Sequence, residues 1–223
     1  MISPYKGTFK VTQSYWNLRA DGTHHAGFDL VGLSDKRLYS PVYGTIVRAG
    51  WENENNHKQG WGQRVVIQIG ESDFYMYFGH MSKIAVKAGQ KIEPGTYLGL
   101  EGSTGKSTGS HLHWEIRKND TKKEVQNVST YSGIKNEASK DPQKSEWGVN
   151  LFGPKTLKFG ENEFPDCIFN AMLQSRLADF GYKIVADGIF GLATEFVVNA
   201  YQKTMGLEID GLVGKLTKHS MRL

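Results

Sequence analysis

The stretch Gly102-Ser-Thr-Gly-Lys-Ser-Thr-Gly-Ser-His-Leu-His-Trp-Glu115 joins a run of small residues to the pattern His111-Leu112-His113. Side chains alternate along a β-strand, so His111 and His113 face the same way if this stretch is a strand, with their Cβ atoms about 6.6 Å apart. Two imidazoles in one cleft suggest a metal site, proton transfer, or both. Taken alone, the motif also fits a polar patch on a solvated sheet face.

The first two thirds of the chain have the pattern of a β protein. Short runs rich in β-branched or aromatic residues are bounded by Gly or polar turns; they lie at residues 44–49, 63–69, 74–78 and 112–116. Residues 86–95 are expected to form tight connections, and the polar residues 119–147 a long loop or irregular domain edge. We therefore predict a mainly β domain with an antiparallel sheet over residues 1–150.

The remainder of the chain has a helical period. Apolar residues recur at spacings of three and four from Phe169 to Phe180 and from Leu192 to Met205, and a third short helix is expected after Val213. The segments Asp187-Gly-Ile-Phe-Gly-Leu-Ala-Thr194 and Asp210-Gly-Leu-Val-Gly-Lys-Leu-Thr217 repeat one turn-and-helix-entry pattern. We predict a small all-α, three-helix domain over residues 166–223, after a linker at 151–165.

The composition of the chain limits which metal ligands and which binding partners it can have. The single Cys167 excludes an intramolecular disulfide and a multi-cysteine zinc site, so zinc ligands must be His, Asp or Glu. The net charge of +4 is not concentrated in a Lys/Arg block, so we expect no nucleic-acid partner. A basic surface would suit an anionic target such as a bacterial wall. The alternative is that the excess positive charge belongs to an ordinary solvated face. Gly105-Lys106-Ser107 is not a phosphate-binding loop, because Leu100 stands where that motif needs Gly.

Two further candidate site features lie earlier in the sequence: the segment His25-Ala-Gly-Phe-Asp29 and the isolated His80. In an extended strand, residues four apart are separated by about 13 Å. This is too far for His25 and Asp29 to share an ion at zinc–ligand distances of about 2.0–2.2 Å. The chain must therefore bend between them, and Gly27 makes bending easy.

The order His25-x-Gly-x-Asp29, then Gly79-His80-Met-Ser82, then the Gly102–His113 motif resembles the lysostaphin/LytM-type zinc endopeptidases, which cut peptides of bacterial peptidoglycan. The resemblance covers roughly residues 15–118. It implies that His25, Asp29 and His113 bind one zinc ion and that His80 and His111 are catalytic. One of these two would be the general base, and the other would stabilise the oxyanion or protonate the leaving amine.

Two departures from the family pattern accompany this assignment. His24 precedes His25, but only His25 fits the spacing His-x-Gly-x-Asp. The family usually carries Tyr two residues before the catalytic His, and this chain has Phe78 there, beside Tyr77. We expect His57, His219 and Trp114 to be surface or packing residues.

The C-terminal segment resembles the small three-helix peptidoglycan-binding domain over about residues 166–223. It implies a bacterial peptidoglycan partner and tethering of the catalytic domain to the wall. We expect no membrane insertion and a monomer.

No charged segment followed by an apolar stretch is visible at the start of the chain, so we expect synthesis in the cytoplasm without a signal peptide, and action on the cell wall, as in a bacteriophage endolysin. The alternatives are a processed extracellular autolysin, a non-catalytic wall-binding regulator, and a zinc or carbohydrate-binding module without hydrolysis.

Overall fold

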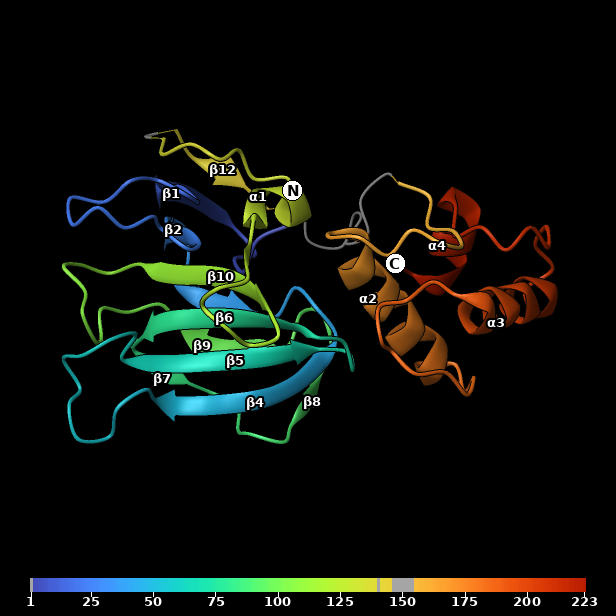
Figure 1. Cartoon of the computed structure of the whole chain (residues 1–223), viewed down its shortest axis with the longest axis horizontal. Helices are drawn as coiled ribbons and strands as arrows, with labels where there is room; N and C mark the ends of the chain where they lie inside the picture. Colours follow the sequence, from blue (N-terminus) through green and yellow to red (C-terminus); the bar gives the residue numbers. More distant parts are fainter. Residues whose placement is uncertain (1, 140, 146–154) are drawn as a thin grey trace. The chain divides into compact units, whose positions relative to one another are not determined.

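The computed structural model describes residues 2–139, 141–145 and 155–223. The chain divides into two compact units, one comprising Met1–Gln68 with Asp73–Glu146 and the other Ile69–Ser72 with Trp147–Leu223. The first is a β unit and the second is helical (Figure 1). The predicted fold class, mainly antiparallel β followed by a small α domain, is therefore confirmed. The linker residues 151–154 lie outside the described residues.

The first unit contains two sheets. In the larger sheet, the strand order is β12-β1-β2-β10-β6-β5-β4-β8, with β11 added on β10, and in the smaller one it is β3-β9-β7. The strands are β1 (Thr8–Gln13), β2 (Phe28–Gly32), β3 (Arg37–Tyr39), β4 (Gly44–Trp51), β5 (Gln63–Ile69), β6 (Phe74–Met81), β7 (Lys83–Ile84), β8 (Lys91–Ile92), β9 (Tyr97–Leu100), β10 (Leu112–Lys118), β11 (Val125–Gln126) and β12 (Gln143–Lys144).

Strand β10 lies inside the large sheet, antiparallel to both β2 and β6. Leu112, Trp114 and Ile116 alternate along it and are fully buried, as the period of two requires for a face packed on the core. The intervening residues, His113 among them, face the opposite side of the sheet. The register sets His113 beside Asp29 of β2 and Gly79 of β6.

All four predicted strand segments are strands, but residues 119–147 are more regular than predicted. They hold the short strands β11 and β12 and the helix α1 (Val128–Ser132). The helix begins at Asn127, whose side chain accepts a hydrogen bond from the backbone of Ser129, and ends at the left-handed Gly133. Residues 86–95 likewise contain β8. These elements are two to five residues long, too short for periodicity to reveal.

The second unit contains the three predicted helices, α2 (Asp166–Asp179), α3 (Leu192–Thr204) and α4 (Lys215–Met221). Each copy of the repeated turn is held by a glutamine of the preceding helix. Gln174 donates to Asp187 and Thr194, and Gln202 donates in the same way to Asp210 and Thr217. The repeat is thus one buried hydrogen-bonding device used twice.

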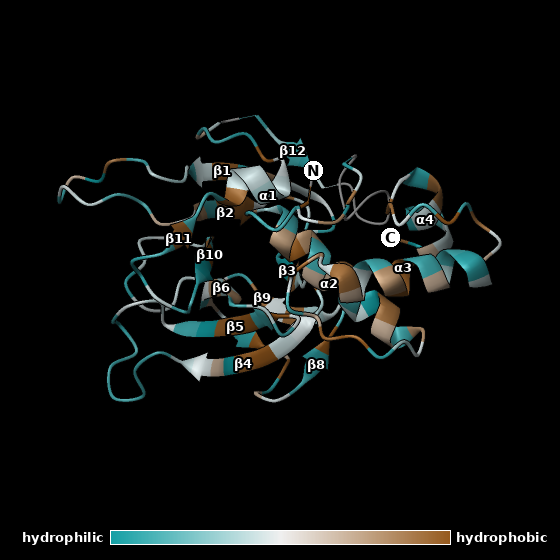
Figure 2. Cartoon of the chain, turned by 45° about the vertical axis from the view of Figure 1, so that its right-hand side comes forward, coloured by the Kyte–Doolittle hydropathy of each residue, from teal (hydrophilic) through white to brown (hydrophobic). Residues whose placement is uncertain are grey.

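The apolar pattern of α3 is only partly a core pattern. Val197 and Tyr201 are buried as predicted, but Leu192 and Phe196 are about three quarters exposed. In Figure 2, helix α3 carries both hydrophobic and hydrophilic colours along its length. The loop between β4 and β5 is largely hydrophilic in the same view. Within the described residues, no helix has the length and apolar character needed to cross a membrane.

Gly27 lies against the backbone of β10. A Cβ built on it would be 2.2 Å from the carbonyl oxygen of Trp114 and 3.0 Å from Cβ of Glu115. Its backbone is not in the left-handed region that favours glycine. The glycine is therefore needed for the close approach of the segment before β2 to β10, rather than for the bend itself.

We predict that Gly27→Ala lowers the free energy of unfolding of the first unit by about 1–3 kcal/mol, because the methyl group must displace the β10 backbone. Urea unfolding followed by tryptophan fluorescence measures this. The matched control is Gly109→Ala, since a Cβ there meets nothing within 4 Å. Equal stability of the two variants would contradict the close-approach argument.

Candidate functional site

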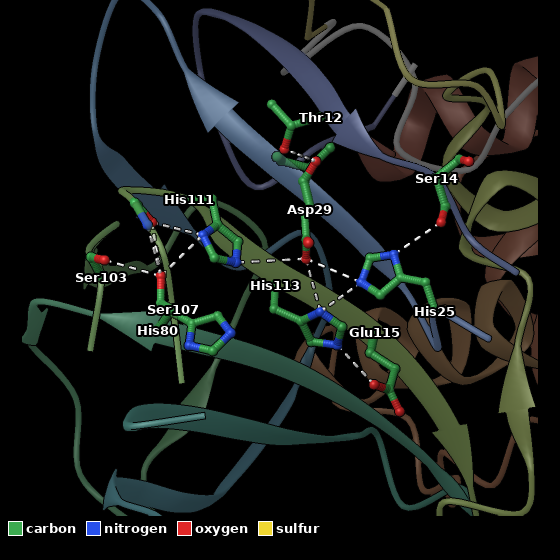
Figure 3. Close-up of polar contacts among 12 residues, drawn as sticks. Thr12, Ser14, His25, Asp29, His80, Ser103, Ser107, His111, His113 and Glu115 are labelled. Carbon is green, nitrogen blue, oxygen red and sulfur yellow. Dashed lines mark hydrogen bonds and ion pairs between the residues drawn. The ribbon is translucent and has the colours of Figure 1, made fainter. Parts of the chain in front are cut away.

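Three ligand atoms from separate parts of the β unit meet beside β10 (Figure 3). Nε2 of His25 is 3.0 Å from Nδ1 of His113 and 3.1 Å from Oδ1 of Asp29, and the last two atoms are 3.0 Å apart. His25 lies just before β2, Asp29 is in β2 and His113 is in β10. The bend expected between His25 and Asp29 is present.

This triangle fits one face of a tetrahedral metal site. Ligands about 2.0–2.1 Å from a tetrahedral ion are about 3.3 Å apart, close to the separations observed here. The donor set of two imidazoles and one carboxylate suits Zn²⁺, and three protein ligands leave a fourth position open.

Hydrogen bonds behind the two imidazoles fix which nitrogen faces the ion. Nδ1 of His25 lies 2.9 Å from the carbonyl oxygen of Ser14, which can only accept, so Nδ1 is the donor and Nε2 keeps its lone pair. Nε2 of His113 lies 2.9 Å from Oε2 of Glu115, which leaves Nδ1 for the ion. Such partners orient metal-binding histidines and raise their basicity.

Glu115 is itself buried, and Nε of Arg117 donates to its other oxygen. Burial raises the pKa of Glu115, but hydrogen bonds and charge from His113 and Arg117 outweigh this and leave it lowered. Glu115 is therefore a carboxylate that can hold the imidazole of His113.

Charge in the ligand triangle favours a cation. Burial raises the pKa of Asp29, yet the hydrogen bond with His113 and the positive charge of that imidazole hold the pKa below its usual range. Burial lowers the pKa of His113, but the hydrogen bonds to Asp29 and Glu115 raise it to about 9. At neutral pH the metal-free protein thus carries a proton on His113, where a cation would otherwise bind.

His80 and His111 lie beside the triangle, with ring centroids 4.6 Å apart. Nδ1 of His80 donates to the carbonyl of Thr104 at 2.8 Å, and Nδ1 of His111 to that of Gly109 at 2.8 Å. These hydrogen bonds engage Nδ1 of both rings and leave Nε2 for water or substrate. Nε2 of His111 is 3.8 Å from Oδ1 of Asp29.

Burial lowers the pKa of His80 to about 4, so this imidazole is neutral at pH 7 and able to accept a proton. Its backbone is in the left-handed region, with φ of 61°, which is uncommon for a residue with a side chain. The backbone of His80 donates to the carbonyl of Trp61 at 2.7 Å, which helps to hold this conformation.

The structure brings together all five residues predicted for the site, whereas His24 stacks on Trp16 and is not part of the ligand triangle. Phe78 is buried in the core, and the hydroxyl of the adjacent Tyr77 bonds Asp120. Sequence reasoning missed Glu115 and Arg117. Their signal was that Glu115 lies two and Arg117 four residues after His113, which places all three on one face of the strand.

Residues 23–126 match the model of peptidase family M23, and residues 171–221 match that of a putative peptidoglycan binding domain. The chain is 39% identical over 92 residues to peptidoglycan DD-endopeptidase ShyA of Vibrio cholerae, covering 41% of this chain and 20% of that protein. It is 32% identical over 98 residues to glycyl-glycine endopeptidase ALE-1 of Staphylococcus capitis, covering 44% and 26%.

Among solved structures, the antimicrobial peptidase lysostaphin of Staphylococcus simulans is similar, with a TM-score of 0.49 and 26% identity, over 56% of this chain and 49% of that one. The chain spans about a fifth to a quarter of the length of these two curated relatives.

We predict that Glu115→Gln weakens Zn²⁺ binding about 10- to 100-fold, because an amide in place of the carboxylate no longer favours the Nε2–H tautomer of His113. Competition with a chromophoric chelator measures the affinity. Glu93→Gln, an exposed change of the same kind at a turn, is the control. Unchanged affinity in Glu115→Gln would refute this orienting role.

We also predict that Zn²⁺ binding near pH 7 releases about one proton, from His113. Since the metal-free pKa of His113 is raised to about 9, the apparent affinity should increase about tenfold per pH unit up to that value. Calorimetry in buffers of different ionisation enthalpy counts the protons. Affinity that is independent of pH between 6 and 8 would contradict the prediction.

Proposed function

Because the chain carries an M23 peptidase domain and a peptidoglycan-binding domain, we propose that it is a zinc-dependent endopeptidase that hydrolyses peptide cross-links or bridges of bacterial peptidoglycan. The observation that carries the proposal is the convergence of three metal-ligand atoms with two further histidines beside them. The names of the relatives, a DD-endopeptidase and a glycyl-glycine endopeptidase, support the substrate class.

In this proposal His25, Asp29 and His113 hold a single zinc ion. When bound, zinc lowers the pKa of a coordinated water and polarises the substrate carbonyl. Asp29 supplies the negative charge of the ligand set, and Glu115 keeps His113 in the tautomer that presents Nδ1.

His80 and His111 move the protons. His80 is neutral at pH 7 and its Nε2 is free, so it accepts the proton of the attacking water. His111, whose Nε2 is likewise free, stabilises the developing negative charge or passes a proton to the leaving amine when it is protonated. The carbonyls of Thr104 and Gly109 fix both rings in the required tautomer.

The helical unit is proposed to bind peptidoglycan and so to raise the concentration of the peptidase domain at its polymer. The bacteriophage endolysin setting stays a prediction, as does the alternative of a processed extracellular autolysin.

Two classes of variant test the function. We predict that His113→Ala and Asp29→Ala lose zinc and activity together, because each removes a ligand. His80→Ala and His111→Ala should keep zinc while the rate of wall-peptide cleavage falls about 10²- to 10⁴-fold. Metal analysis of each purified variant is combined with turbidity loss of purified walls and mass spectrometry of the products.

These measurements also separate the alternatives. A wall-binding regulator or binding module predicts no cleavage by the zinc-loaded wild type, and that result would refute the proposed enzyme. Zinc retained at full occupancy in His113→Ala and Asp29→Ala would refute the ligand assignment. The masses of the products identify the bond that is cut.

A further inference from the structure

A pocket of about 210 Å³ lies on the face of the large sheet that carries the metal-ligand triangle. Four cationic side chains line it, Arg48, Arg64, Arg117 and Lys122, against two acidic ones, Glu52 and Asp120. The lining therefore carries an excess of two positive charges. None of these residues has a role in the peptidase chemistry described above, apart from the contact of Arg117 with Glu115.

The cations are held in place by contacts on several sides. The guanidinium of Arg117 lies 4.7 Å from the ring centroid of Trp61 and 4.4 Å from that of Tyr77. Arg48 bonds both oxygens of Asp120 at 2.5 Å, and Nη1 of Arg64 bonds Glu52 at 3.1 Å. A guanidinium has five N–H donors, so Arg64 and Arg117 retain donors for a ligand.

The segment that completes the pocket has an unusual backbone. Asn119 and Asp120 both have positive φ, 50° and 54°, in the turn after β10. This turn places Asp120 on Arg48 and brings the exposed Lys122 to the pocket. Burial lowers the pKa of Arg64, and the charges of Arg48 and Arg117 lower it further against the opposing charge of Glu52.

The pocket adjoins the metal-ligand triangle. Trp61, which lines the pocket, has its ring centroid 5.3 Å from that of His113. Arg117 follows His113 by four residues on the same face of β10, a separation of about 13 Å along the strand. A group bound at Arg117 is therefore about four residues of an extended peptide away from a bond at the metal.

We propose that this pocket is a subsite for a free carboxylate of the wall peptide, about four residues of extended chain from the bond that is cut. Arginine forks match the planar carboxylate, and the aromatic walls of Trp61 and Tyr77 limit the pocket to a small group. The proposal rests on the proposed peptidase function and adds to it a preference for substrates that are not amidated at this position.

The test uses two cross-linked peptides that differ only in whether the carboxylate about four residues from the scissile bond is free or is a carboxamide. The wild type should cut the free acid with a kcat/KM at least about fivefold higher, mainly through KM. Lys122→Gln should reduce this preference about two- to fivefold, as expected for one exposed charge, and Lys122→Glu should abolish it.

The matched control is Lys123→Gln, which removes the neighbouring exposed lysine that does not line the pocket. It should keep the wild-type preference. Equal cleavage of the two peptides by the wild type, or a preference that survives Lys122→Glu, would overturn the carboxylate subsite and leave the peptidase function standing.

A binding measurement separates the two proposals. N-acetyl-D-alanine should shift the side-chain NMR signals of Arg64 and Arg117, while its amide should not, and Lys122→Glu should weaken the shift. If neither peptide is cut but these shifts occur, the peptidase function fails and the anion pocket stands. If the acid and the amide shift the signals equally, or neither does, the subsite is refuted.

Discussion

The pairing of β10 with β2 is the constraint on which the site depends. It sets His113 opposite Asp29, and the same strand pairs on its other edge with β6, which carries His80. A slip of one residue would turn His113 to the core and Trp114 to the outer face. The buried side chains of Leu112, Trp114 and Ile116 prevent that slip, so the hydrophobic core of the sheet determines the position of the proposed metal ligands.

Oxygen atoms that can only accept hydrogen bonds orient the histidine rings of the site. The carbonyls of Ser14, Thr104 and Gly109 and the carboxylate of Glu115 each hold one imidazole by the nitrogen that is not needed. Four histidines are thus each held by one ring nitrogen, which leaves the other nitrogen for a metal ion, water or substrate. The cost of burying these rings is offset by these hydrogen bonds.

The sequence predicted the features that depend on short-range patterns of residues. It did not predict the contacts between residues far apart in the chain. The period of two identified β10 and the common direction of His111 and His113, while the assignment of His25, Asp29 and His80 needed the family resemblance. The carbonyl partners could not be predicted, because which backbone oxygen meets a ring is decided by tertiary packing. Glu115 could have been found, since it follows the same alternation. In the helical unit, the repeat was visible, but the glutamines that hold its turns, Gln174 and Gln202, gave no signal before the helices were placed.

Arg117 belongs to both the metal site and the cationic pocket, and this connects them. Its Nε bonds Glu115, which holds the imidazole of His113, while its guanidinium plane lies against Trp61 and Tyr77. An anion drawn to Arg117 would compete with Glu115 for the same positive charge and so alter the hold on His113. A change at Arg117 would therefore disturb both sites at once. Lys122 lines only the pocket, and its charge can be removed without affecting the partners of the metal ligands.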